Sequence, residues 1–183
     1  MAAPGEMTGA ALPALLKDEA LAGRWTLDAS RSAIGLRSKS MWGLAPVKGV
    51  FREVSGTGTV SPGGEVSGTL TVAAGSIDTG NPKRDTHLRS ADFFHSTAYR
   101  DITFTVDQIR PASQGVTVSG TLTVRDRTRP LSFEAQVAVP GAAEVWLDAE
   151  ILVNRADFGL TWNQLGMASM NNTITVHAVF TSG

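Results

Sequence analysis

Much of the chain alternates between apolar residues and small polar residues, so that every second position is apolar. The stretch 66–74 is the clearest case, since Val66, Leu70 and Val72 fall on one side of an extended chain and Ser67 falls on the other. A period of two residues is typical of a strand with one dry face and one face in water. The same alternation predicts strands over 24–28, 34–40, 47–54, 66–74, 102–107, 116–124, 131–139, 145–153 and 174–180, and a Gly-rich stretch, 55–60, leads from 47–54 to the next turn.

Short turn-forming sequences separate these strands, and no helix longer than two or three turns is predicted. Pro62-Gly63-Gly64 and Pro140-Gly141 have the composition of hairpin turns. Strands joined by tight turns pair in the antiparallel sense. The prediction is therefore an all-β fold, either a barrel or a sandwich of eight to ten strands. An immunoglobulin-like sandwich is disfavoured, but not excluded, because the chain has no cysteine pair.

One segment, 76–94, interrupts the alternation with a dense set of polar residues. Within it Asn81 is a good helix N-cap, and Pro82 suits the first helical position. Asp85 and Arg89 are four positions apart, the spacing at which an acid and a base can pair along one helical turn. We therefore predict a short helix after Asn81, with an Asp85–Arg89 ion pair that holds the segment over one end of the fold.

The same segment resembles the signature of the YceI-like family of lipid-binding proteins. That signature runs close to Ser-Ile-x-Thr-Gly-Asn-x-x-Arg-Asp-x-His-Leu-Arg-Ser-x-Asp-Phe-Phe, and every fixed position is matched between Ser76 and Phe94. Two shorter stretches, 120–130 and 154–160, support the resemblance, which covers the chain from about Gly23 onward. The resemblance implies a single antiparallel β-barrel of about eight strands, lipocalin-like, with one or two short helices.

The resemblance also divides the chain into a lipid-binding barrel domain at 23–183 and a flexible leader at 1–22. The one apolar stretch of the leader, 10–16, has no basic residues before it and is followed directly by Lys17-Asp18-Glu19. A secretory signal has a basic start and a longer apolar centre, so none is predicted and the cytoplasm is the expected location.

A barrel of this family implies a lumen that holds one long apolar lipid, a polyisoprenoid or an isoprenoid quinone, for transport, storage or sensing. The sequence offers a physical reason, since small residues stand near the middle of otherwise bulky apolar rows, at Gly68, Gly120, Ala135, Ala149 and Ala178. An eight-stranded barrel is just wide enough either to fill with side chains or to hold a ligand. Small residues would widen a lumen, or they would seat larger neighbours in a filled barrel, and the pattern alone does not separate these readings.

The residues expected at the ligand fall into two groups. The lining candidates are Phe51, Leu70, Phe93, Phe94, Phe104, Leu122, Phe133, Phe158 and Trp162. The candidates for the polar end are Asn81, Arg84, Asp85, His87 and Arg89. For Asp85 and Arg89 the structural ion pair and a role at the lipid head group remain alternatives.

Composition restricts the remaining functions. The formal net charge is −1 and there is no cysteine, so neither a nucleic-acid-binding patch nor a cysteinyl metal site is expected. No apolar run approaches the roughly 18 residues of a membrane span. Only His87 and His95 lie near carboxylates, at a spacing that matches no common metal site, and no cofactor is expected. Whether the chain forms a homodimer stays open.

Two alternatives to lipid binding stay open as well. One is an enzyme, a hydrolase or isomerase, that acts on the same lipid through His87. Asp85 and His87 do not form a natural acid–base dyad, because residues two apart on a helix point in different directions. The other alternative is a filled barrel without a ligand. A catalytic His87 would have to face a cavity, whereas a filled barrel would contain none.

Overall fold

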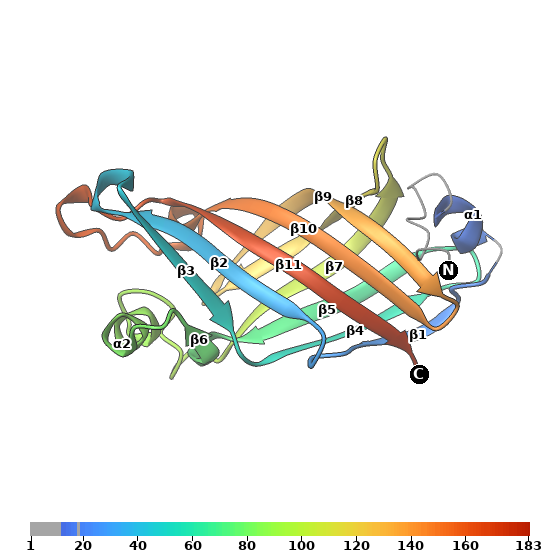
Figure 1. Cartoon of the computed structure of the whole chain (residues 1–183), viewed down its shortest axis with the longest axis horizontal. Coiled ribbons are helices and arrows are strands. Elements are labelled where there is room, and N and C mark those ends of the chain that lie inside the picture. The colour runs from blue at the N-terminus through green and yellow to red at the C-terminus, as the bar shows by residue number, and fades with distance from the viewer. Residues whose placement is uncertain (1–11, 18) are drawn as a thin grey trace, which may run out of the picture.

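The computed structural model describes residues 12–17 and 19–183, and in this part of the chain eleven strands form one strongly bent sheet (Figure 1). Eight of them close into a ring in the order β1-β4-β5-β7-β8-β9-β10-β11, because β11 also pairs with β1. The bounds of these eight strands are Gly23–Leu27 for β1, Val54–Val60 for β4, Val66–Ala73 for β5, Asp101–Pro111 for β7, Val116–Val124 for β8, Arg127–Gly141 for β9, Glu144–Asn154 for β10 and Asn171–Ser182 for β11. All neighbours in the ring are antiparallel, so the predicted antiparallel barrel of about eight strands is confirmed.

Three further strands extend one end of the barrel: β2 (Ala33–Ser40), β3 (Ala45–Phe51) and β6 (Ile77–Asp78). β2 pairs with β11 beyond the part of β11 that β1 uses, so β1 and β2 continue one another across a break at 28–32. β3 and β4 are related in the same way, since β3 pairs with β2 and β4 pairs with β1. Their break lies at Arg52 and Glu53, inside the predicted strand 47–54, and the Gly-rich stretch 55–60 forms most of β4.

The strand wall is incomplete beside β3. One edge of β3 pairs with β2 along its whole length, but on the other edge only Val50 and Phe51 pair, with β6. α2 (Pro82–Arg89) follows β6 and lies at this end of the barrel, drawn in green in Figure 1. Leu88 of α2 packs against the buried cluster that contains Phe51 and Ile77, so the helix covers the core at this end.

The remaining helical elements are short. α1 (Leu12–Lys17) lies at the opposite end of the barrel from α2 (Figure 1), and the 3₁₀ turns are η1 (Met41–Gly43), η2 (Ala74–Ser76), η3 (Arg155–Phe158) and η4 (Gln164–Gly166). Residues 1–11 and 18 of the predicted leader lie outside the described residues, and its looseness stays a prediction. Leu21, near the end of that predicted leader, is buried in the barrel core. None of the described helices has the length and apolar character needed to cross a membrane.

The alternation that predicted the strands decides which side chains face inward. In β8, every second residue from Val116 to Val124 is buried, and the residues between them are partly exposed. The register shifts once between β7 and β8 and once between β9 and β10. Bulges of this kind bend a strand and increase its twist, which closing a sheet into a barrel requires.

Candidate functional site

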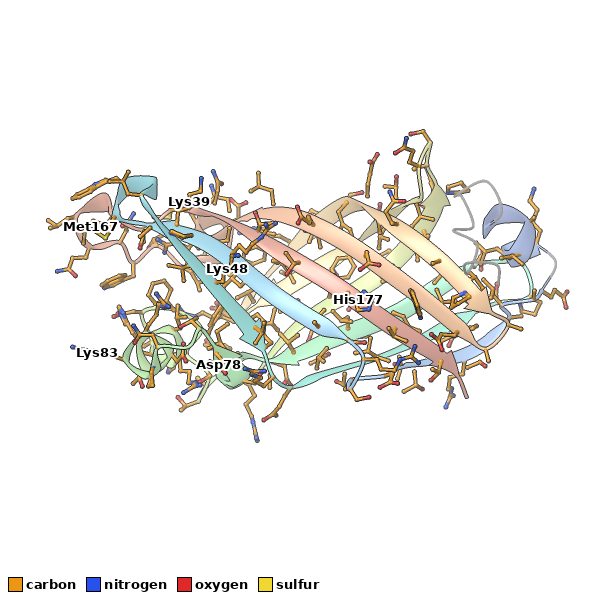
Figure 2. All side chains as sticks on the ribbon, in the orientation of Figure 1. Lys39, Lys48, Asp78, Lys83, Met167 and His177 are labelled. Carbon is orange, nitrogen blue, oxygen red and sulfur yellow. The ribbon has the colours of Figure 1, made fainter. Side chains whose placement is uncertain are left out.

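A cavity of about 460 Å³ runs inside the barrel. This volume lies within the range of roughly 300–1,000 Å³ that is typical of small-molecule sites. On β11 the alternate residues Ile174, Val176, Ala178 and Phe180 line the cavity, whereas His177 lies on the outer surface (Figure 2). A filled barrel would contain no such space, so that alternative is wrong.

The apolar residues that the sequence singled out come together around this cavity. All nine of them line it: Phe51, Leu70, Phe93, Phe94, Phe104, Leu122, Phe133, Phe158 and Trp162. Their rings also contact one another, as Phe104 and Phe133 do with centroids 5.4 Å apart, and Phe51 and Phe94 at 6.0 Å. That these side chains bind a ligand stays a prediction.

The small residues of the apolar rows divide into two groups. Gly68 and Ala178 line the cavity, and Gly120, Ala135 and Ala149 do not. A Cβ added at Gly120 would collide with the carbonyl oxygen of Thr105 and lie 2.8 Å from the ring of Phe104. Ala135 is buried in the same cluster as Trp25. For the second group the idea of a widened lumen is wrong, because these residues make room for neighbouring strands and rings instead.

Apolar side chains line the cavity at the end where β1 begins. Leu16, Leu21 and Trp25 line it there, and the indole N–H of Trp25 donates a hydrogen bond to the carbonyl oxygen of Leu21 at 2.9 Å. Leu21 and Trp25 pack with Val116 and Val118 in one buried cluster. This end is therefore largely apolar, and the charged residues of the lining lie at the other end, near α2.

The start of α2 confirms the predicted cap. The side-chain oxygen Oδ1 of Asn81 accepts a hydrogen bond from the backbone N–H of Arg84 at 3.1 Å, and Pro82 takes the first helical position. Because its side chain is used in this way, Asn81 does not line the cavity. Its role in the structure is to begin the helix that carries the next polar residues.

The predicted Asp85–Arg89 ion pair is wrong. Asp85 is buried and accepts hydrogen bonds from the backbone N–H of Thr79 at 3.0 Å and from its hydroxyl at 2.5 Å. Arg89 donates to the carbonyl oxygens of Gly75 at 2.7 Å and Ile77 at 2.9 Å. Both side chains therefore make their hydrogen bonds to the segment before the helix, and not to each other. Both residues fasten α2 to this segment, and neither lines the cavity.

Arg84 and His87 do line the cavity, on the side of α2 that faces it. The guanidinium of Arg84 donates from Nε to the Thr79 hydroxyl at 2.8 Å and from Nη2 to the Thr79 carbonyl oxygen at 3.2 Å. His87 Nε2 lies 2.9 Å from Asp92 Oδ2, so the carboxylate that orients this histidine is Asp92 and not Asp85. The His87 ring also packs edge to face with two other rings. Its centroid lies 5.1 Å from that of Phe93 and 4.4 Å from that of Trp162.

Arg155 is a cavity residue that is not among the ligand candidates predicted from the sequence. It is 9% exposed, and it donates to the carbonyl oxygens of Leu160, Trp162 and Ser169 at distances between 2.6 and 3.0 Å. Burial lowers the pKa of its guanidinium, although an arginine of this kind remains charged. Its Nη2 is buried and has no hydrogen-bond partner among the residues described. The guanidinium lies 5.5 Å from the centroid of the Phe93 ring.

The charged residues of the cavity wall all carry the same sign. Lys39, Arg84 and Arg155 line it, together with His87, and no aspartate or glutamate does so within the described part of the chain. In the sequence Arg155 stands beside Asp157 and Phe158. This context suggests a turn, but it does not indicate that the Arg155 side chain faces the cavity. The cavity therefore has an apolar body and one basic end. No cluster of three or more histidine or acidic side chains that could hold a metal ion occurs in 12–17 and 19–183.

Comparison with known proteins decides the family. Residues 25–181 match the family model described as the YceI-like domain. The chain belongs to the YceI-like family. The resemblance of the 76–94 segment is thereby confirmed over nearly the whole barrel. Protein YceI of Shigella flexneri is 30% identical over 134 residues, which are 69% of this chain and 70% of that protein.

Solved structures share the fold of this YceI-like protein. BcnA of Burkholderia cenocepacia superimposes with a TM-score of 0.76 at 23% identity, covering 84% of this chain and 98% of that one. A polyisoprenoid binding domain from Saccharophagus degradans gives 0.70 at 19% identity, covering 87% and 98%. The YceI protein of Campylobacter jejuni gives 0.60 at 26% identity, covering 73% and 84%.

Proposed function

We propose that this YceI-like protein binds a lipid with a long isoprenoid-like tail inside its barrel, with the polar head of the lipid at the α2 end. The observation that carries the proposal is the shape and chemistry of the cavity, which is apolar along the barrel and basic at one end only. Moving a hydrocarbon chain from water into such a space is worth roughly 0.8 kcal/mol per buried methylene. A long chain can therefore be held without any specific polar contact along the tail.

The basic end favours a lipid whose head accepts hydrogen bonds. Lys39, Arg84 and Arg155 supply positive charge and hydrogen-bond donors at that end. Phosphate, carboxylate and quinone oxygens all accept hydrogen bonds. Among isoprenoid lipids, a polyisoprenoid phosphate and an isoprenoid quinone combine such a head with a long apolar tail. The polyisoprenoid binding attributed to the related Saccharophagus degradans domain supports an isoprenoid tail.

Carrying, storing or sensing such a lipid needs binding alone, and we propose one of these roles over catalysis. A second candidate is an enzyme acting on the same lipid, because His87 lines the cavity and lies 2.9 Å from a carboxylate oxygen of Asp92. An imidazole held by a carboxylate can act as a general base. The variant His87→Gln separates the two, since it keeps a polar side chain of similar size but cannot act as an acid or base near neutral pH.

The test is to extract purified protein with organic solvent and identify the released lipids by mass spectrometry. The expected result is one long-chain isoprenoid species enriched over an unrelated protein purified from the same cells. His87→Gln should retain within about tenfold as much of it. An extract without enriched lipid contradicts the proposed function. A lipid that the wild type converts and His87→Gln leaves intact would favour the enzyme.

A further inference from the structure

The end of the barrel near α2 carries an unusual concentration of exposed apolar side chains. Trp42 is 67% exposed, Leu44 is 83% exposed and Leu165 is 77% exposed. Trp42 belongs to η1, between β2 and β3, and Leu165 belongs to η4, between β10 and β11. Apolar groups that are this exposed and this close in the fold mark an interaction site more often than chance.

Hydrogen bonds hold the two loops side by side. The backbone N–H of Trp42 donates to the carbonyl oxygen of Met167 at 3.2 Å, and that of Ser169 donates to the carbonyl oxygen of Lys39 at 2.9 Å. Figure 1 shows the two loops meeting at the same extremity of the molecule, and Figure 2 places Lys39 and Met167 there. We refer to 41–44 and 164–167 together as the apolar tip.

The backbone of the apolar tip is strained. Met41, Trp42 and Leu165 have φ values of 50°, 55° and 54°, in the left-handed region that residues other than glycine avoid. Such conformations persist where the surrounding structure enforces them, and they concentrate at functional sites. Within the tip they accompany side chains that are turned to solvent instead of being packed.

Three lysines lie on the elements at the end of the barrel that carries the apolar tip. Lys39 on β2, Lys48 on β3 and Lys83 on α2 are exposed, lie around this end in Figure 2, and make no ion pair with the residues described. The carboxylates of Asp78 and Asp92 at this end are already paired, with Arg52 and His87. Four exposed carboxylates at this end have no such partner among the residues described: Glu53, Asp101, Asp126 and Asp157. The exposed Arg100, Arg127 and Arg129 are unpaired there as well, so together with the three lysines the unpaired charge here is predominantly positive.

The apolar tip directly adjoins residues that line the cavity. Ser38, Lys39 and Ser40 of β2, and Ala168 and Ser169 after η4, belong to the cavity lining. Across from them the lining continues on α2, next to the edge of β3 that lacks a strand neighbour. A lipid that leaves or enters the barrel at its polar end therefore passes beside the tip.

We propose that the apolar tip docks the protein onto an anionic lipid surface, with Trp42, Leu44 and Leu165 inserted among the head groups and the lysines facing the phosphates. Tryptophan favours the membrane–water interface, and basic residues near a surface add attraction to anionic lipids. The inference rests on the proposed function, because docking of this kind lets a lipid move between bilayer and cavity without crossing water.

A second copy of the chain is a poorer occupant of the same surface. A two-fold contact through the tip would bring the same lysines of both copies together. The few exposed side chains of the tip are also far fewer than the roughly 20–30 residues a side of a stable protein interface. A bilayer needs neither a complementary shape nor a large rigid area.

The test is flotation of the full chain with vesicles, either of phosphatidylcholine alone or of equal parts phosphatidylcholine and phosphatidylglycerol. We expect the protein to float with the mixed vesicles, and binding to fall about tenfold in Trp42→Ser combined with Leu165→Ser. Lys39→Gln combined with Lys48→Gln should cause a similar loss, which high salt should reproduce in the wild type. Leu44→Ser, which removes the third apolar side chain of the tip, should also weaken binding to the mixed vesicles.

Two control variants match these changes elsewhere on the surface. Leu152→Ser removes an exposed leucine of the barrel wall, which is 69% exposed, and Lys17→Gln removes an exposed lysine of α1 at the opposite end. Both should float like the wild type. The proposal is overturned if the tip variants float as well as the controls, if no vesicle binds, or if the tip variants only change the oligomeric state.

Lipid extracted from the same preparations separates this inference from the proposed function. Bound isoprenoid in a protein that does not float overturns the docking and leaves the lipid-binding proposal standing. Flotation that depends on the tip, in a protein that carries no lipid, supports docking to the surface and contradicts the lipid-binding proposal.

Discussion

The rings of His87 and Trp162 meet edge to face with their centroids 4.4 Å apart, and this contact joins α2 to the loop before β11. Phe93 contacts both rings, so the three form one aromatic cluster at the polar end of the cavity. Two segments far apart in the chain thus close the barrel together where its strand wall is incomplete. The contacts among these three rings hold α2 and the loop before β11 together at the polar end of the cavity.

Trp162→Ala should loosen this end. Removing a partly buried tryptophan ring should lower the free energy of unfolding by about 2–3 kcal/mol and reduce the amount of lipid retained during purification. Urea unfolding and mass spectrometry of the extract measure the two effects. Trp42→Ala is the matched control, because its ring is exposed and should contribute little to stability. Equal stability losses in the two variants would contradict the clustered arrangement.

Arg155 should prove to have both a structural and a ligand role. Arg155→Met leaves the carbonyl oxygens of Leu160, Trp162 and Ser169 without their donor, at a cost of about 1–3 kcal/mol for each group that stays unsatisfied. Arg155→Lys keeps the charge and should retain more of any anionic lipid than Arg155→Met at similar stability. Equal lipid retention in the two variants would show that the charge at this position does not contact the ligand.

Asp85 and Arg89 should act independently, because each bonds to backbone groups and not to the other. Asp85→Ala and Arg89→Ala should each lower the free energy of unfolding by about 1–3 kcal/mol. The double variant should lose close to the sum, as residues without a direct interaction do. Thermal and urea unfolding of the three variants give the coupling energy. A coupling of more than about 1 kcal/mol would restore the ion pair that the structure lacks.

Asp78 should give the protein an acid-sensitive contact beside α2. The backbone N–H of Gly80 and the guanidinium of Arg52 donate to its carboxylate and lower its pKa from the usual 3.8. Because its pKa is lower in the folded state, ionised Asp78 stabilises the folded protein. This stabilisation is fully present above pH 3.8 and is lost as the pH falls through the lowered pKa. Asp78→Asn should therefore flatten the fall of Tm at the acid end of this range. Asp107→Asn, at an exposed aspartate, should leave that fall unchanged.

The sequence was sufficient for the strands because their chemistry is local. Each strand has a dry face, and a period of two is visible in residues such as Val116, Val118 and Leu122 without any knowledge of their partners. The same holds for the cap of α2, since Asn81 and Arg84 are three positions apart. Five of the lining residues were predictable for this reason too, because they lie on the apolar faces of strands: Phe51, Leu70, Phe104, Leu122 and Phe133. The other four, Phe93, Phe94, Phe158 and Trp162, lie outside the strands.

What failed depended on contacts between distant segments. Asp85 and Arg89 have the right spacing to pair, but backbone donors of Thr79 and acceptors of Gly75 and Ile77 lie closer to them in the fold. Helical spacing gives no information about these competing groups. Arg155 was missed as a cavity residue for the same reason, since its direction follows from the carbonyl oxygens that the loop before β11 folds around it.

The measurement that tests lipid binding most directly is native mass spectrometry of the intact protein, comparing Val176→Trp with His177→Trp. These are neighbours on β11, but the first side chain lines the cavity and the second lies on the outer surface. The wild type and His177→Trp should carry one bound lipid each, and Val176→Trp should fold yet lose at least about nine-tenths of it, since the indole would occupy the lumen. A wild type without bound mass, or a Val176→Trp variant as fully loaded as His177→Trp, would contradict a lipid held inside the barrel.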